Sequence, residues 1–232
     1  RSLGKTGLSE FKLTLAGGLG SPDERRAQPF VHGKVKGSDS PHQIISKLMQ
    51  SNAQTLLDFA NTADASAFKT ATRLLLATIK ARGRIEFYGL GNSGIVAQDG
   101  QHKFFRLGAS TVAYADAHLQ IMAASLLSKS DTVVTISNSG NSRELLEAAR
   151  IAQSQGASVI AISASGSPLA AMCKTLLAAD HQESRDQYSP MESRLLHLSI
   201  IDILATCTAL ALGDKVRDKQ RQIKRNLERV RT

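Results

Sequence analysis

Cysteine is scarce in this sequence, which has 2 among 232 residues. Cys173 and Cys207 fall far apart on predicted helices, an arrangement that suits neither a zinc site nor a disulfide framework. We therefore expect two reduced, buried thiols, and we expect neither a metal site nor a cofactor.

Long hydrophobic runs are also missing. No segment approaches the ~20 uninterrupted apolar residues that span a bilayer, and no secretory leader is recognisable. The sequence therefore predicts a soluble, cytoplasmic protein without a membrane partner. It begins at Arg1 instead of an initiator Met, so we expect a trimmed chain. Its length allows one substantial core with a small module at one end.

Positive charge is concentrated at the two ends. The formal net charge is +9, and residues 1–36 and 215–232 carry it, whereas residues 37–214 are nearly neutral. Basic ends suggest a polyanionic partner. In the segment Lys215–Arg231, however, four apolar residues fall on one helical stripe, so we expect this helix to pack against its own domain or a second subunit. They are Val216, Ile223, Leu227 and Val230.

The middle of the chain alternates short apolar strands with helices. Helical spacing predicts two or three helices within 41–82, then Ile95–Leu107, Ala117–Leu127 capped by Asp116, and a helix that starts at a capping pair, Asn141 and Glu144, and ends near Gly156. This alternation predicts an α/β, doubly wound, flavodoxin-like five-stranded parallel sheet with flanking N- and C-terminal helices. The predicted strands are Arg84–Leu90, Ser110–Ala115, Asp131–Ser137, Ser158–Ala164 and Thr175–Ala179.

Two Ser- and Gly-rich turns follow the first and third predicted strands, at 89–94 and 137–142. In a flavodoxin-like order the strand order reverses between these two strands, and ligands bind there at the carboxyl edge. Hydroxyls and backbone amides at helix starts suit a phosphate. The turns therefore predict a site for a phosphorylated metabolite.

The first turn also spells G-x-G-x-x-G, the fingerprint of a dinucleotide site, and Asp116 stands near the position of its ribose-binding acid. A dinucleotide site does not need a hydroxyl-rich loop after the third strand, and Asp116 is equally explained as a helix cap. A dinucleotide-dependent enzyme is thus the third alternative.

Residues 84–180 resemble the sugar isomerase (SIS) domain, a phosphosugar-binding module. The resemblance rests on G-x-G-x-S-G at Gly89–Gly94, I-S-x-S-G-x-S-x-E at Ile136–Glu144 and Ser-Pro-Leu-Ala at Ser167–Ala170. It implies that serines in the two turns hold the phosphate and neighbouring oxygens, while Glu192 binds ligand hydroxyls or caps the last long helix. The expected effector-binding residues are Gly91, Asn92, Ser93, Ser137, Asn138, Ser139, Ser142 and Glu192.

The amino end, Arg1–Leu13, resembles the closing part of the helix-turn-helix domain of RpiR-type transcriptional regulators, which carry an SIS domain downstream. This resemblance implies a helix-turn-helix remnant at 1–19 with Arg1, Lys5 and Lys12 facing duplex DNA, a linker at 20–40, and an SIS effector domain at 41–232. The implied protein is a repressor, a homodimer or higher homo-oligomer, that senses a phosphorylated sugar acid such as 2-keto-3-deoxy-6-phosphogluconate.

SIS domains also occur in aldose–ketose isomerases, which is the second alternative. Isomerisation needs a base that moves a proton beside a carbonyl. Glu183 and Glu192 are candidate bases, and four histidines are candidate partners, but none stands out, so we expect no catalytic residue. The histidines are His102, His118, His181 and His197.

Overall fold

The computed structural model describes residues 35–181 and 191–230. The chain divides into two compact units: residues up to Gln50 belong to the first, and the sheet with its helices belongs to the second. Helix α2 (Pro41–Thr62) runs from one unit into the other. It starts at a capping box in which Ser40 Oγ accepts from Gln43 N and Gln43 Oε1 accepts from Ser40 N.

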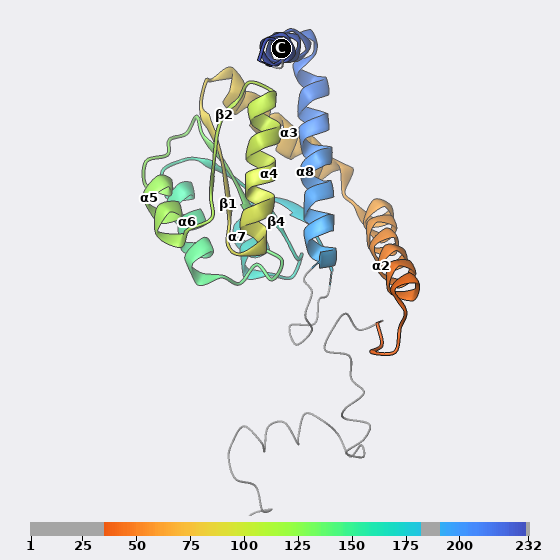
Figure 1. The fold of residues 1–232 in the computed structure, drawn as a ribbon. Coiled ribbons are helices and arrows are strands. Elements are labelled where there is room, and N and C mark those ends of the chain that lie inside the picture. Colours follow the sequence, from red (N-terminus) through yellow and green to blue (C-terminus); the bar gives the residue numbers. More distant parts are fainter. Residues whose placement is uncertain (1–34, 182–190, 231–232) are drawn as a thin grey trace, which may run out of the picture. The chain divides into compact units, whose positions relative to one another are not determined.

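The second unit is built on a five-stranded parallel sheet, which confirms the α/β prediction (Figure 1). Its order, β2-β1-β3-β4-β5, is the flavodoxin-like order that the sequence predicts. The strands are β1 (Arg84–Gly89), β2 (Ser110–Tyr114), β3 (Thr132–Ile136), β4 (Ser158–Ser163) and β5 (Thr175–Ala178).

Helices cover both faces of this sheet (Figure 1). On one face lie α3 (Ala65–Lys80), α4 (Asn92–Arg106) and α8 (Met191–Leu212), and on the other lie α5 (Ala117–Ala124), α6 (Arg143–Ser154) and α7 (Pro168–Met172). Alternate residues of each strand feed the two cores. Phe87 points to the α3/α4/α8 core, and Tyr88 points to the α5/α6 core.

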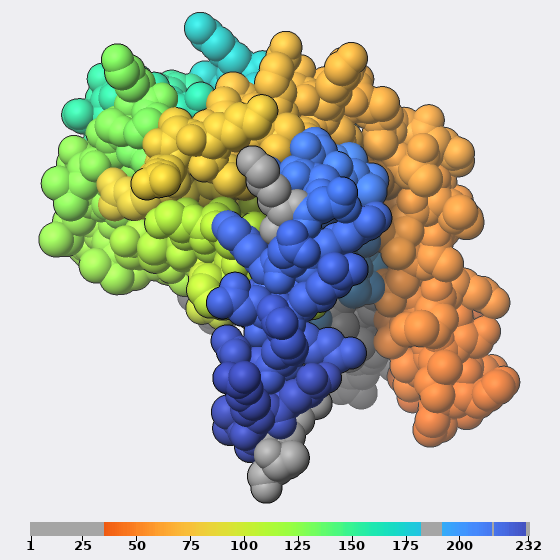
Figure 2. Space-filling model, turned by 90° about the horizontal axis from the view of Figure 1, so that it is seen from above, coloured from red at the N-terminus to blue at the C-terminus, as the bar shows by residue number. Residues whose placement is uncertain are grey.

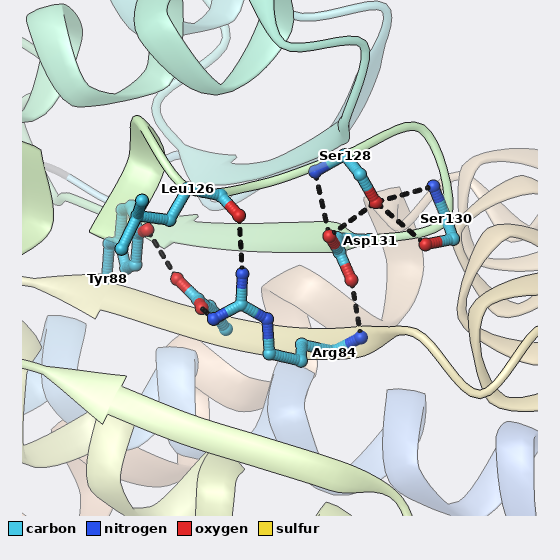
Figure 3. A network of polar contacts seen from close by, with 7 residues as sticks. Arg84, Tyr88, Leu126, Ser128, Ser130 and Asp131 are labelled. Atoms are coloured by element: carbon cyan, nitrogen blue, oxygen red, sulfur yellow. Dashed lines mark hydrogen bonds and ion pairs between the residues drawn. The ribbon is translucent and has the colours of Figure 1, made fainter. Parts of the chain in front are cut away.

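A polar network ties the amino ends of β1 and β3 together (Figure 3). Arg84 N donates to Asp131 Oδ1 at 2.7 Å, and the Arg84 guanidinium lies 3.3 Å from Glu86 Oε1. Glu86 is fully buried and accepts from the Tyr88 hydroxyl at 2.5 Å. Burial raises the pKa of the Glu86 carboxyl, although Tyr88 and Arg84 act in the opposite direction. This network lies at the edge opposite the predicted ligand site, so it acts on stability.

Three local predictions need correction. Helix α4 starts at Asn92 and not at Ile95, because Gly91 with φ +55 begins it. The residue preceding α6 is Ser142 and not Asn141. Cys173 follows α7 as its C-cap and does not lie within a helix. The predicted cap of α5 is confirmed, because Asp116 Oδ1 accepts from Leu119 N at 2.9 Å.

Helix α8 is long and apolar enough to cross a membrane by length and composition, with a mean hydropathy of 2.0 in an 18-residue window of Glu192–Leu212. Its inward stripe nevertheless packs in the core, where Leu196, Ile200 and Leu204 are buried. Helix α9 (Asp214–Glu228) follows it and is the dark blue ridge in Figure 2. Among the apolar residues of its stripe only Val216 is buried.

Candidate functional site

The sheet brings the two predicted turns side by side. Strands β1 and β3 are neighbours, and Gly89 at the end of β1 pairs with Ile136 at the end of β3. The turns 90–93 and 137–142 therefore leave adjacent strands at the same edge. The structure thus brings together the residues that the sequence predicts as phosphate ligands.

Glycines allow the backbone of the first turn to pass close to neighbouring backbone and side-chain atoms. A Cβ on Gly89 would meet Ser93 O at 2.3 Å, and a Cβ on Gly94 would meet Ala115 Cβ at 2.8 Å. Gly91 has a positive φ that other residues rarely adopt. Ser93 follows in the first turn of α4 and is half-buried, whereas Gly91 and Asn92 are exposed.

The second turn is held by a hydrogen bond within the turn and by close packing against residues at the end of β4 and just after it. Ser137 is 6% exposed, and its Oγ accepts from Gly140 N at 3.0 Å. Gly140 has φ +58, and a Cβ there would collide with Ser163 and Ser167, so only glycine fits. Because the Ser137 hydroxyl oxygen accepts this hydrogen bond, the hydroxyl proton remains available for a hydrogen bond to a ligand.

The helices that start at these turns have no side-chain cap. Neither α4, after Gly91, nor α6, after Ser142, has a side chain bonded to its first amides. Helices α3, α5 and α7 are capped by side chains: those of Asp64, Asp116 and Ser167. Helix α9 also has no side-chain cap, but it lies away from the sheet's carboxyl edge. Two positive helix ends thus converge where a phosphate is expected.

The other predicted residues of the second turn offer further polar groups. Asn138 is half-buried, and its Oδ1 has no hydrogen-bond partner among the described residues. Ser139 is exposed and Ser142 is half-buried. A buried acceptor without a partner usually indicates a missing ligand or water, and Asn138 therefore suits a ligand hydroxyl.

Gln120 is a site residue that sequence reasoning missed. It is fully buried on α5, and its Nε2 donates to Gly89 O at 3.1 Å and to Tyr114 O at 2.8 Å. The amide thereby fixes the ends of β1 and β2 where the first turn starts. Both acceptors are backbone carbonyls, which leave no signal in the sequence.

Glu192 lies against His181 at the start of α8. The distance between Glu192 Oε2 and His181 Nε2 is 3.2 Å, and both side chains are mostly buried. His197 is 1% exposed, and burial together with nearby His181 lowers its pKa to about 4. A carboxylate, a mostly buried imidazole and a fully buried, neutral imidazole therefore share this end of α8. Glu192 was a candidate base and His181 one of four candidate partners in the sequence, but no sequence pattern singled out this pair.

Several predicted residues do not join the site. Arg1, Lys5, Lys12 and Glu183 lie outside the described residues. His102 and His118 are exposed on α4 and α5. Within the residues that the structure describes, no cluster of His, Cys, Asp or Glu could hold a metal ion. Asp116, which the dinucleotide interpretation required, caps α5.

Comparison with known proteins identifies the family. The SIS domain model matches residues 78–207. The HTH-type transcriptional regulator HexR of Escherichia coli is 37% identical over 231 residues, covering 100% of this chain and 77% of HexR. The chain is an SIS-domain protein of the RpiR regulator type.

Other relatives of this SIS-domain protein are much longer than the chain. "Bifunctional protein glk" of Burkholderia orbicola is 41% identical over 210 residues, covering 90% of this chain and 31% of that protein. The chain thus spans about a third of the length of these relatives.

Solved structures share the SIS fold. Vibrio vulnificus NanR, complexed with ManNAc-6P, has a TM-score of 0.73 at 22% identity, covering 98% of this chain and 77% of that chain. The phosphoheptose isomerase GmhA of Neisseria gonorrhoeae has a TM-score of 0.64 at 21% identity, covering 73% of this chain and 98% of that chain. A protein solved with a bound phosphosugar and a phosphoheptose isomerase therefore share this fold, and the fold alone does not separate binding from catalysis.

Proposed function

We propose that the chain is the effector-sensing part of a DNA-binding transcriptional regulator of sugar metabolism. Its SIS domain binds a phosphorylated sugar acid such as 2-keto-3-deoxy-6-phosphogluconate. The observation that carries the proposal is the pair of adjacent turns at the ends of β1 and β3, each followed by a helix without a side-chain cap. Similarity to HexR over the whole chain supports the regulatory role.

A phosphate suits this pair of turns because two helix ends meet it there, and Arg143 is the first residue of α6. The N-terminal partial charges of α4 and α6 stabilise a dianion, and backbone amides at helix starts bond its oxygens. Ser93 and Ser137 donate hydroxyl hydrogen bonds from the two turns. The Oδ1 of Asn138 and the carboxylate of Glu192 are acceptors, which suits the hydroxyls of a sugar acid.

The regulator acts on DNA as a homodimer or larger homo-oligomer in the cytoplasm. Arg1, Lys5 and Lys12 belong to the part that contacts the duplex, and positive charge at this end of the chain supports the assignment. The effector relieves repression by changing the relative placement of the two DNA-reading heads. It can do so only by the difference between its affinities for the two arrangements.

Titration calorimetry with a panel of ligands tests the effector assignment. The panel contains 2-keto-3-deoxy-6-phosphogluconate, its dephosphorylated form, ManNAc-6P and inorganic phosphate. We expect the keto-acid phosphate to bind most tightly and the dephosphorylated form to bind at least 100-fold more weakly, about 2.7 kcal/mol. Equal affinity for the phosphorylated and dephosphorylated acids would show that the turns do not hold the phosphate.

The pair formed by Glu192 and His181 favours a second candidate function, phosphosugar isomerisation. A carboxylate and an imidazole 3.2 Å apart can exchange a proton with a substrate beside its carbonyl. NMR in D2O separates the two functions. A sensor returns its ligand without deuterium after long incubation, whereas an isomerase incorporates deuterium next to the carbonyl and loses this activity in Glu192→Gln.

A further inference from the structure

Arg194, in the first turn of α8, is a half-buried cation that the described residues leave without a partner. Its guanidinium forms no ion pair and no hydrogen bond within the described part of the chain. The other half-buried lysines and arginines whose side chains are described lie 2.6–3.3 Å from carboxylates; they are Lys47, Arg84 and Lys103. A partly buried charge without a partner costs stability. Such a group usually indicates a missing ligand or ion.

Arg194 lies on the face of α8 that packs against α4, the helix that starts at the first turn of the candidate site. Helices α4 and α8 lie side by side, and both start at the carboxyl edge of the sheet (Figure 1). A Cβ on Gly100 of α4 would meet Ile201 Cδ1 of α8 at 3.3 Å. Two turns earlier on the same faces stand Ser93 and Arg194. The parallel register therefore places Arg194 level with Ser93, about 10 Å closer to the carboxyl edge.

The direction of the Arg194 side chain follows from the direction of α8. Lys103 Nζ lies 2.7 Å from Asp202 Oδ1, further along both helices, so α4 and α8 run the same way. In a helix the Cα–Cβ bonds tilt toward the N-terminus, so the Arg194 side chain extends toward the start of α8. Glu192, a predicted effector-binding residue, stands two residues earlier and lies against His181. The guanidinium thus extends toward the edge that carries the candidate site.

A phosphorylated sugar acid has two anionic groups, a phosphate at one end and a carboxylate at the other. The two turns supply the uncapped starts of α4 and α6 for one of them, the phosphate. The carboxylate needs a counter-charge of its own. A guanidinium suits it, because it is planar, stays charged and presents parallel N–H groups that match the two oxygens of a carboxylate.

We propose that Arg194 binds the carboxylate of the effector and thereby makes the site selective for sugar acids over neutral sugar phosphates. This assignment rests on the proposed function. The turns hold the phosphate, which every sugar phosphate has, and Arg194 holds the group that distinguishes an acid. The half-buried guanidinium gains its partner when the effector binds. Arg143, at the start of α6, is exposed, so water already stabilises its charge.

Titration calorimetry on the full chain tests this assignment with two ligands. They are 2-keto-3-deoxy-6-phosphogluconate and its C1 primary amide, which differ only in the charge of one end. We expect the parent to bind the acid roughly 10- to 150-fold more tightly than the amide, because the amide lacks the charged acceptor for Arg194. Arg194→Gln should bind the amide as tightly as the parent does, and it should bind the acid no more tightly than the amide.

Two further variants complete the series. Arg194→Lys keeps the charge but loses the paired N–H groups, so it should retain part of the preference for the acid. Arg106→Gln is the matched control, because Arg106 is exposed at the end of α4, at the opposite edge of the sheet, and this variant should keep the full preference. Thermal unfolding without ligand checks the fold of each protein. If Arg194→Gln does not fold, Arg194→Lys decides by the same two affinities.

Three results would overturn the assignment. The first is an Arg194→Gln protein that keeps the parent's preference for the acid; loss of that preference in Arg143→Gln would then assign the carboxylate to α6. The second is an equal loss of affinity for acid and amide in Arg194→Gln, which would place Arg194 at the phosphate. The third is a parent that binds acid and amide equally tightly, which would leave the phosphate site of the proposed function intact. A parent that binds neither ligand would refute the proposed effector as well.

Discussion

Ser137→Ala gives the sharpest test of the candidate site. The Ser137 hydroxyl accepts from Gly140 N at 3.0 Å, so its own proton is available for a phosphate oxygen. A hydrogen bond to a charged acceptor contributes about 1.5–3 kcal/mol, so we expect affinity to fall roughly 10- to 150-fold. Because the lost contact is to the phosphate, every phosphate ester that binds should lose affinity by a similar factor.

The same substitution removes the acceptor of Gly140 N, and this loss must be measured separately. We expect it to destabilise the fold by about 1–3 kcal/mol, which thermal unfolding without ligand reports. Ser154→Ala is the matched control, because Ser154 is exposed at the far end of α6 and donates to Ile151 O at 2.7 Å. Ser137→Ala and Ser93→Ala proteins that fold and bind the effector as tightly as the parent would refute the assigned site.

Three further predictions concern titration and DNA. The pKa of Glu86 is raised above 4.5 in the folded protein, so stability is greatest below that pH and falls as pH rises through the folded pKa. Glu86→Gln should flatten this slope in urea unfolding between pH 4 and 7. The pKa of His197 is lowered from 6.5 to about 4, so stability is full above pH 6.5 and falls by up to about 3 kcal/mol as pH drops through 4. His197→Leu should remove this loss. If the stability of this variant fell between pH 6.5 and 4 as much as that of the parent, the buried neutral imidazole would be contradicted. In gel shifts at physiological salt, a chain extended upstream by a complete helix-turn-helix domain should bind an operator in an effector-dependent way. The present chain should bind DNA weakly and without sequence preference; equal, effector-insensitive binding by both would count against the regulator.

The sheet was predictable from sequence because its signals are local. Buried parallel strands are short apolar runs separated by helical periodicity, and all five strands follow from that pattern. Their order is not a local property; it was predicted from the flavodoxin-like fold class, and the structure confirms it. Helix starts were less accurate for a physical reason. Helical periodicity is first recognisable at an apolar residue, Ile95, whereas the N-cap of the helix is Gly91, four residues earlier.

The support of the site was not predictable, because it depends on contacts between distant parts of the chain. Gln120 bonds two backbone carbonyls, and a buried glutamine on a helix has no recognisable pattern of its own. Glu192 and His181 meet only because α8 starts beside the segment that follows β5. Sequence motifs located the two turns of the candidate site, whereas the side chains that hold these turns in place needed the structure.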